Sequence, residues 1–226
     1  VKGRLLQAIL DGRYPPGARI VETRVAKEFG TSQAPVREAL RDLEGLGVVE
    51  TAPFKGASVR QPTMEELMEA FEVRAILEGH GAVLAVERLA APDFERLTDL
   101  VDQMRDAAEA GDALTEAEVD TEFHQLIIHH SGNATLERVW SKLEPFLRTY
   151  ITIGSLSTGA DRRKVADRHL PIIEALQHGN ADVIEDAFRT HFEESASALA
   201  EVWPHHTGDS DAAGQAGPDE LPAVVI

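Results

Sequence analysis

The chain contains no cysteine among its 226 residues. This absence excludes disulfide scaffolds, cysteine-ligated zinc fingers, iron–sulfur clusters and thiol catalysis. The sequence also lacks any apolar run near the roughly 18 to 20 residues that a membrane-spanning helix needs, which excludes an integral membrane protein. Its first residues lack the basic-then-apolar pattern of a secretory signal, so we expect a cytoplasmic protein. With 43% hydrophobic residues, the chain can form one large domain or two smaller ones, each with a core.

Positive charge is scarce, because 22 lysines and arginines oppose 39 acidic residues and the net charge at pH 7 is -17. On average this argues against a polyanionic partner, but the charges are unevenly distributed. Residues 1–60 hold ten basic and seven acidic residues, whereas the rest of the chain holds 12 basic and 32 acidic residues. A mildly basic first part on an acidic body predicts two domains with different partners. We expect only the first domain to contact DNA.

Three helices and two strands are predicted in the first 61 residues. Gly30 stands where a helix C-terminus needs a left-handed residue, and Thr31 or Ser32 can cap the helix that follows. The predicted elements are helices over 4–10, Glu22–Phe29 and about 31–46, then strands over Val48–Thr51 and Ala57–Arg60. This order of helices, short turn and hairpin is that of a winged helix-turn-helix domain, which we place at residues 1–61.

Everything from the Gln61–Pro62 break to residue 203 is predicted to be helical. Thr63 and Glu66 form a capping box at the start of the first long helix. The predicted helices cover 63–89, 93–110, 115–130, 134–153, 161–178 and 182–203. We therefore predict a mainly α fold with an all-helical bundle at residues 62–203. The segment 204–226 is rich in Gly, Ala, Asp and Pro and is predicted to be a disordered tail.

The segment from residue 32 to residue 43 carries the most information about function. Val36, Leu40 and Leu43 fall on one helical stripe, which predicts that this side is buried. In a helix-turn-helix the N-terminal end of the second helix enters the major groove, where Arg37 can pair with guanine and Gln33 with adenine. The candidate DNA-binding residues are Arg24, Ser32, Gln33, Ala34, Arg37, Lys55 and Gly56. The alternative is that these are ordinary solvated side chains on a small helical domain.

Four ionisable residues of the body stand where apolar ones are expected. Asp120 and His124 share one helix face, His169 lies on an apolar stripe, and His191 follows Phe188 closely. Burying a carboxylate and three imidazoles is costly unless they are paired or bind a metal. Such a donor set suits a divalent cation such as Zn, Ni, Mn or Fe. The alternative is a set of separate structural histidines.

Two arginines are candidates for holding an anionic ligand. Arg148 lies in the apolar stretch from Phe146 to Tyr150, which favours a buried anion beside it. Arg74 also lies in an apolar helix, but Glu78 one turn later offers it a partner. We rank Arg148 above Arg74, and a plain salt bridge remains an alternative for each.

Several short segments, in this order, resemble the GntR family of bacterial transcription regulators: Pro15–Gly17, Ala26–Gly30, Ala34–Leu40, Leu46–Glu50 and Lys55–Ala57. The Arg74–Glu78 region and the helical body resemble the FadR-like subfamily, whose ligand domain is called FCD. The resemblance covers residues 1 to about 203. Asp120, His124, His169 and His191 match that family's metal-ligand pattern residue by residue. Members often have Ser-Arg-Thr-Pro where this chain has Ser32-Gln33-Ala34-Pro35, which affects the operator sequence rather than the fold.

The resemblance implies a ligand-responsive DNA-binding regulator, which we expect to be a repressor and not an enzyme. Its expected partners are a pseudo-palindromic DNA operator, a second copy of the chain and a small carboxylate effector, which would bind the metal and Arg148. One alternative is a metal-dependent hydrolase that uses the Asp/His cluster, although the chain lacks a His-Glu-x-x-His motif. Another is a helical interaction module, which leaves the predicted recognition helix unexplained.

Overall fold

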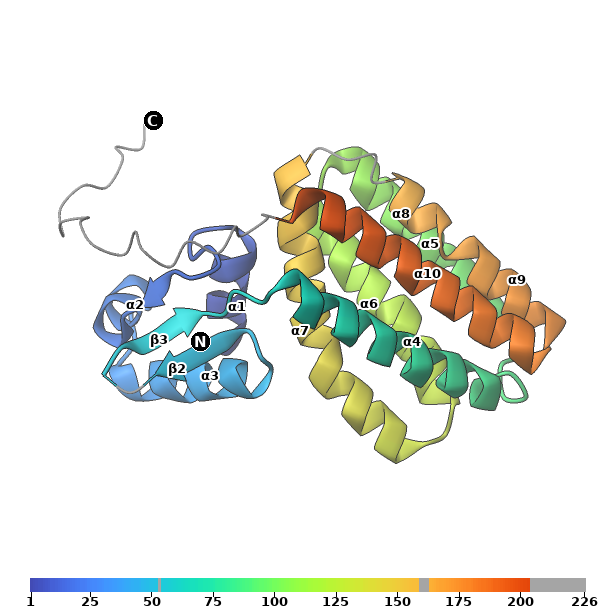
Figure 1. The fold of residues 1–226 in the computed structure, drawn as a ribbon, viewed down its shortest axis with the longest axis horizontal. Helices are drawn as coiled ribbons and strands as arrows, with labels where there is room; N and C mark the ends of the chain where they lie inside the picture. Colours follow the sequence, from blue (N-terminus) through green and yellow to red (C-terminus); the bar gives the residue numbers. More distant parts are fainter. Residues whose placement is uncertain (53, 159–162, 204–226) are drawn as a thin grey trace.

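The computed structural model describes residues 1–52, 54–158 and 163–203. Figure 1 shows a small N-terminal domain (the head, residues 1–59) beside a larger bundle of helices (the body, residues 64–203). The mainly α fold predicted from the sequence is confirmed. The predicted tail, 204–226, lies outside the described residues.

The head combines three helices with a three-stranded sheet. Its elements are α1 (Lys2–Leu10), β1 (Arg19–Ile20), α2 (Glu22–Phe29), α3 (Gln33–Gly45), β2 (Val49–Ala52) and β3 (Gly56–Val59). The strands are antiparallel in the order β1-β3-β2. Leu5, Val25 and Leu43 are fully buried between the helices and the sheet. The winged helix-turn-helix is therefore confirmed, with β1 as an addition, because two residues are too few to show the alternation that predicts a strand.

Gly30 makes the turn between α2 and α3 possible. It has φ 63°, in the left-handed region, and its N–H bonds back to the carbonyls of Ala26 and Lys27. A side chain is disfavoured in this conformation, which is why a glycine closes α2 here. The tight turn fixes α3 against α2 and thereby sets which side of α3 faces outward.

Seven helices form the described part of the body: α4 (Met64–Ala85), α5 (Ala91–Ala110), α6 (Ala113–His130), α7 (Ala134–Thr158), α8 (Arg163–Asp167), α9 (Leu170–His178) and α10 (Ala181–Val202). The predicted capping box is present, since Thr63 accepts from the Glu66 N–H and Glu66 accepts from the Thr63 N–H. Helix α10 packs along α4, and α5 packs along α6 (Figure 1). Their shared core contains Leu67, Phe123 and Phe188.

The sequence predicts one helix over 161–178, and this prediction is wrong. The structure has two helices instead, with Arg168 and His169 between α8 and α9. The physical cause is Pro171 in the first turn of α9, which lacks the N–H that a continuous helix would need. His169 thus becomes the N-cap residue of α9. The break places its imidazole at a helix start rather than along a helix side.

The linker between the head and the body is held against α7. The Tyr150 hydroxyl donates a hydrogen bond of 2.7 Å to the Arg60 carbonyl. The Arg60 guanidinium lies over the Phe146 ring, 5.1 Å from its centroid, and pairs with Glu66 at 2.5 Å. On the head side, a Cβ at Gly47 would come within 3.2 Å of Phe146. Helix α7 therefore contacts the head, the linker and the interior of the body.

Candidate functional site

All seven candidate DNA-binding residues of the head are exposed. Gln33 begins α3, and Arg37 follows one turn later on its outward side, while Val36, Leu40 and Leu43 are buried beneath it as predicted. Lys55 and Gly56 lie where β2 turns into β3. This arrangement presents the N-terminal half of α3 to a ligand outside the domain, which is how a recognition helix is presented.

Arg37 is not a free side chain, although the sequence gives no sign of a partner. Its Nε lies 3.2 Å from each carboxylate oxygen of Glu22, and its Nη2 lies 2.8 Å from Oε2. The hydrogen bond with Arg37 lowers the pKa of Glu22, and the same bond raises the pKa of Arg37. Both groups are thus charged at neutral pH. The two residues are 15 positions apart on different helices, so periodicity could not connect them.

Phe54 at the wing is a second residue that the sequence reasoning missed. Its side chain is fully exposed, and its φ of 65° is unusual for a residue other than glycine. An exposed aromatic ring beside Lys55 gives the wing tip both an apolar and a cationic group.

The body brings the four predicted metal ligands together from three helices. His124 on α6, His169 at the start of α9 and His191 on α10 each place one ring nitrogen within 4.8 Å of the other two. The Nε2 atoms of His124 and His169 are 3.3 Å apart. Asp120 Oδ1 lies 3.1 Å from His169 Nε2 and 3.9 Å from His124 Nε2. The three imidazoles are buried and Asp120 is partly open, so a ligand could approach the cluster from the side of the carboxylate.

The second nitrogen of each imidazole shows why a cation fits this cluster. His124 Nδ1 faces Glu78 Oε2 at 2.5 Å, and His169 Nδ1 faces the Ala166 carbonyl at 3.1 Å. His191 Nδ1 faces the Arg168 carbonyl at 3.4 Å. An Nδ1 that donates to such an acceptor leaves the Nε2 of the same ring with a lone pair. In that tautomer, three imidazoles that meet at one buried place would suit a divalent cation.

The pKa values of His191 and Asp120 are shifted toward the forms in which these residues bind a metal. Burial, together with the neighbouring His169 and His124, lowers the pKa of His191 well below its usual value, so its imidazole is neutral. Burial alone would raise the pKa of Asp120, but the hydrogen bond with His169 and nearby positive charge outweigh it and lower this pKa. A neutral His191 and an ionised Asp120 are the forms in which these two residues bind a metal.

Glu78 forms a second layer behind the histidines, together with Arg74 and Trp140. Its Oε1 accepts from Arg74 Nε at 2.5 Å and from Trp140 Nε1 at 2.6 Å. Burial alone would raise the pKa of Glu78, but Arg74 and His124 lower it to about 2. The sequence predicts the Arg74–Glu78 pair from its i, i+4 spacing. It could not reveal the contact with Trp140, which is 62 residues away.

The two candidate effector arginines differ in what they bind. Arg148 is partly exposed, and its Nε pairs with Glu144 at 3.0 Å. Glu144 also accepts a hydrogen bond from Thr121, the residue after Asp120, so this pair lies near the cluster. Arg74 is buried, and its Nη2 has no hydrogen-bond partner in the described part of the chain. A buried guanidinium nitrogen of this kind is costly unless something else accepts from it.

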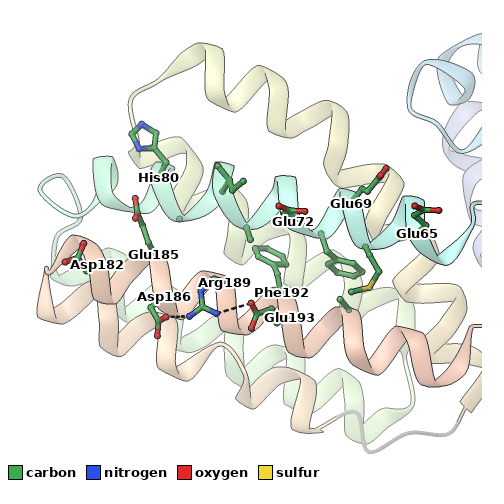
Figure 2. Close-up of a pocket in the computed structure, with 16 residues that line it drawn as sticks. Glu65, Glu69, Glu72, His80, Asp182, Glu185, Asp186, Arg189, Phe192 and Glu193 are labelled. Carbon is green, nitrogen blue, oxygen red and sulfur yellow. Dashed lines mark hydrogen bonds and ion pairs between the residues drawn. The ribbon is translucent and has the colours of Figure 1, made fainter.

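An open groove of about 980 Å³ separates the outer sides of α4 and α10. Figure 2 shows acidic side chains along both helices, namely Glu65, Glu69, Glu72, Asp182, Glu185, Asp186 and Glu193. Arg189 bonds to Asp186 and Glu193 within it. The exposed Met68 and Ile76 add apolar surface. This groove is separate from the histidine cluster.

Comparisons with known proteins agree with this geometry. The model of the bacterial regulatory proteins of the gntR family matches residues 1–59, and the FCD domain model matches residues 69–194. The chain belongs to the GntR family of bacterial transcription regulators. Both domain models indicate a DNA-binding regulator and not an enzyme, so the hydrolase alternative is set aside.

Relatives of this regulator cover nearly the whole chain. It is 34% identical over 220 residues to a probable D-xylose utilization operon transcriptional repressor of Paenarthrobacter nicotinovorans, covering 96% of this chain and 92% of that protein. It is 24% identical to the gluconate operon transcriptional repressor of Bacillus licheniformis, covering 88% and 83%. The solved structure of E. coli McbR/YncC matches with a TM-score of 0.73 at 24% identity, covering 88% of this chain and 95% of that one.

None of the described helices is long and apolar enough to cross a membrane.

Replacing Glu78 by Gln tests the second layer. The change leaves Arg74 buried without its counter-charge, so we expect the free energy of unfolding to fall by about 3–5 kcal/mol. Urea denaturation with a chelator present would measure this without a contribution from metal. Glu72→Gln, at an exposed position of the same helix, should change stability by no more than about 0.5 kcal/mol. Equal effects of the two substitutions would contradict the structural role of Glu78.

Proposed function

We propose that this regulator is a homodimeric repressor whose affinity for DNA depends on a small organic acid bound at a metal centre in the body. The observation that carries the proposal is the convergence of three buried imidazole nitrogens beside the Asp120 carboxylate. A DNA-binding regulator acts where the chromosome lies, so the same proposal includes a cytoplasmic location. The choice of repression follows the names of the two relatives described above.

The metal would be held by His124, His169, His191 and Asp120. When bound, a divalent cation such as Zn, Ni or Mn supplies a Lewis acid that attracts carboxylate oxygens. Glu78 keeps the proton on His124 Nδ1, so that Nε2 remains a ligand. Arg148 and Arg74 are the proposed partners of the effector's anionic group. The Nη2 of Arg74, which has no hydrogen-bond partner among the residues that the structure describes, supports this role. The partly open Asp120 marks the side from which the effector enters.

Helix α7 offers a physical route from this centre to the head. Near its start, Trp140 donates to Glu78, which contacts the metal ligand His124. Further along the same helix, Tyr150 and Phe146 contact Arg60 in the linker. An effector that prefers one position of α7 would thereby favour one placement of the head, in proportion to its differential affinity.

The outer side of α4 supports the homodimer. The opposite side of this helix packs in the core through Leu67, Phe71 and Ala82, yet Met68, Val73 and Ile76 are exposed. A helix with apolar residues on both sides is usually covered on both sides. A second copy related by a two-fold axis would cover this surface and hold two heads over a pseudo-palindromic operator.

DNA reading is tested with Arg37→Ala. The probes are a duplex that the wild-type protein selects from a random pool and a scrambled duplex. The difference in binding free energy between them should fall by about 1–3 kcal/mol, because a bidentate base contact disappears. Arg138→Ala, which removes an exposed arginine of the body, should leave this discrimination intact. Footprinting of the wild type should protect two half-sites about one helical turn apart. Unchanged discrimination in Arg37→Ala would show that α3 does not read DNA as proposed.

The metal centre is tested with His191→Ala. We expect a lower metal content by elemental analysis and a smaller rise in melting temperature when Zn, Ni or Mn is added, because a metal bound by the folded state alone stabilises that state. His178→Ala removes an exposed imidazole at the end of α9 and should behave like the wild type. If the wild type binds none of these metals, the centre is not a metal site.

The effector class is tested by calorimetric titration with D-gluconate as a carboxylate and D-xylose as a neutral probe, since operons named for these compounds are assigned to the relatives above. We expect D-gluconate to bind with metal present, and Arg148→Ala to weaken this binding about tenfold. The affinity of the wild type for D-gluconate should differ between the free protein and the protein bound to the selected duplex, because coupling between two sites is reciprocal. Binding of D-xylose alone would contradict the carboxylate class, and equal affinities with and without DNA would contradict regulation.

A further inference from the structure

The ion pair between Arg37 and Glu22 leaves one edge of the guanidinium available. An arginine has five N–H donors, of which one is on Nε and two are on each Nη. Glu22 accepts from Nε and from one N–H of Nη2. One N–H on each Nη remains as a parallel pair at the end of the planar group, and the second N–H of Nη1 points back toward Cδ. Recognition of guanine O6 and N7 needs two such parallel donors.

Both ends of this ion pair are anchored in the folded head. Glu22 is the first residue of α2, where the helix dipole favours a carboxylate. Arg37 projects from the second turn of α3, and the neighbouring Val36 is fully buried. The Arg37 side chain is still 54% exposed, so the ion pair restrains it without covering it. A shallow depression lined by both residues and by Arg41 opens beside them.

We propose that Glu22 is a positioning residue that holds Arg37 in the orientation in which its free edge reads a guanine. An unrestrained arginine loses rotamer freedom when it binds a base, whereas a restrained one has already lost most of it. The carboxylate also repels the DNA backbone, so it lowers affinity for all sequences alike while it favours the one with a guanine at this position. Glu22 therefore sets the sequence selectivity of the head at the expense of affinity.

This inference rests on the proposed reading of DNA by α3, and it makes a different prediction for Glu22 than for Arg37. The probes are the selected duplex, a scrambled duplex of the same composition, and the selected duplex with 7-deazaguanine in place of each guanine in turn. With the full-length protein, we expect Glu22→Ala to lower the ratio of selected to scrambled affinity about tenfold. Its affinity for the scrambled duplex should stay the same or rise, since a negative charge has been removed.

Coupling between the two residues gives a sharper readout. The deazaguanine that weakens the wild type most should have little effect on Arg37→Ala, because the guanine N7 contact is already absent. Glu22→Ala should show the same insensitivity, and the double variant should be no less selective than Arg37→Ala alone. Glu22→Gln keeps one acceptor oxygen and should fall between the wild type and Glu22→Ala. It also provides a second variant should Glu22→Ala prove unstable.

Glu38→Ala is the matched control. It removes one exposed carboxylate from the recognition helix, about 100° around the axis from Arg37. We expect the affinity of Glu38→Ala for the scrambled duplex to change as that of Glu22→Ala does. Its ratio of selected to scrambled affinity should equal that of the wild type. A tighter complex of Glu22→Ala with the selected duplex at an unchanged or higher ratio would overturn the inference and show that Glu22 masks Arg37. Preserved selectivity in Arg37→Ala would instead overturn the proposed role of α3 itself.

Discussion

The buried carboxylate of Glu78 is the interaction on which the arrangement of the body depends. It accepts hydrogen bonds from Arg74 within α4 and from Trp140 on α7, and it lies 2.5 Å from His124 Nδ1 on α6, so one side chain connects three helices. Removing such a charge from water is costly, and these three contacts compensate for it. The carboxylate beside His124 Nδ1 favours the tautomer with the proton on that nitrogen. The constraint that holds the helices together is therefore also the one that leaves the other ring nitrogen of His124 directed toward the cluster.

The head also contains an arginine paired with a carboxylate, but this pair differs from that of the body in its exposure. Arg74 and Glu78 are fully buried, so their pairing serves packing, whereas Arg37 and Glu22 are partly exposed and leave donors available. The exposed Arg189 of the body is engaged by two carboxylates, since it bonds to both Asp186 and Glu193. The net charge of -17 comes from the part of the chain that follows the head, since residues 1–60 hold ten basic and seven acidic residues. The acidic body is repelled by phosphates, and the head is the part that can be attracted.

The sequence predicts those features that depend on short spacing. Asp120 and His124 share a helix face because they are four residues apart, and the order of elements in the head follows from its caps and glycines. Features that depend on packing between distant segments could not be predicted. The contact of Glu22 with Arg37 and that of Glu78 with Trp140 join separate helices. The break between α8 and α9 was predictable in principle, because Pro171 interrupts the helical hydrogen bonds that the apolar stripe around it suggests.

Helix α7 has a built-in weak point between its two functional ends. Trp140 contacts the layer behind the histidines and Tyr150 contacts the linker, and ten residues of helix separate them by about 15 Å. Pro145 lies between them inside the helix and cannot donate a backbone hydrogen bond to residue 141. A helix interrupted in this way bends at lower cost than a continuous one. In the proposed mechanism, a shift of Trp140 would bend α7 at Pro145 and change how Phe146 and Tyr150 meet Arg60, and with them the placement of the head.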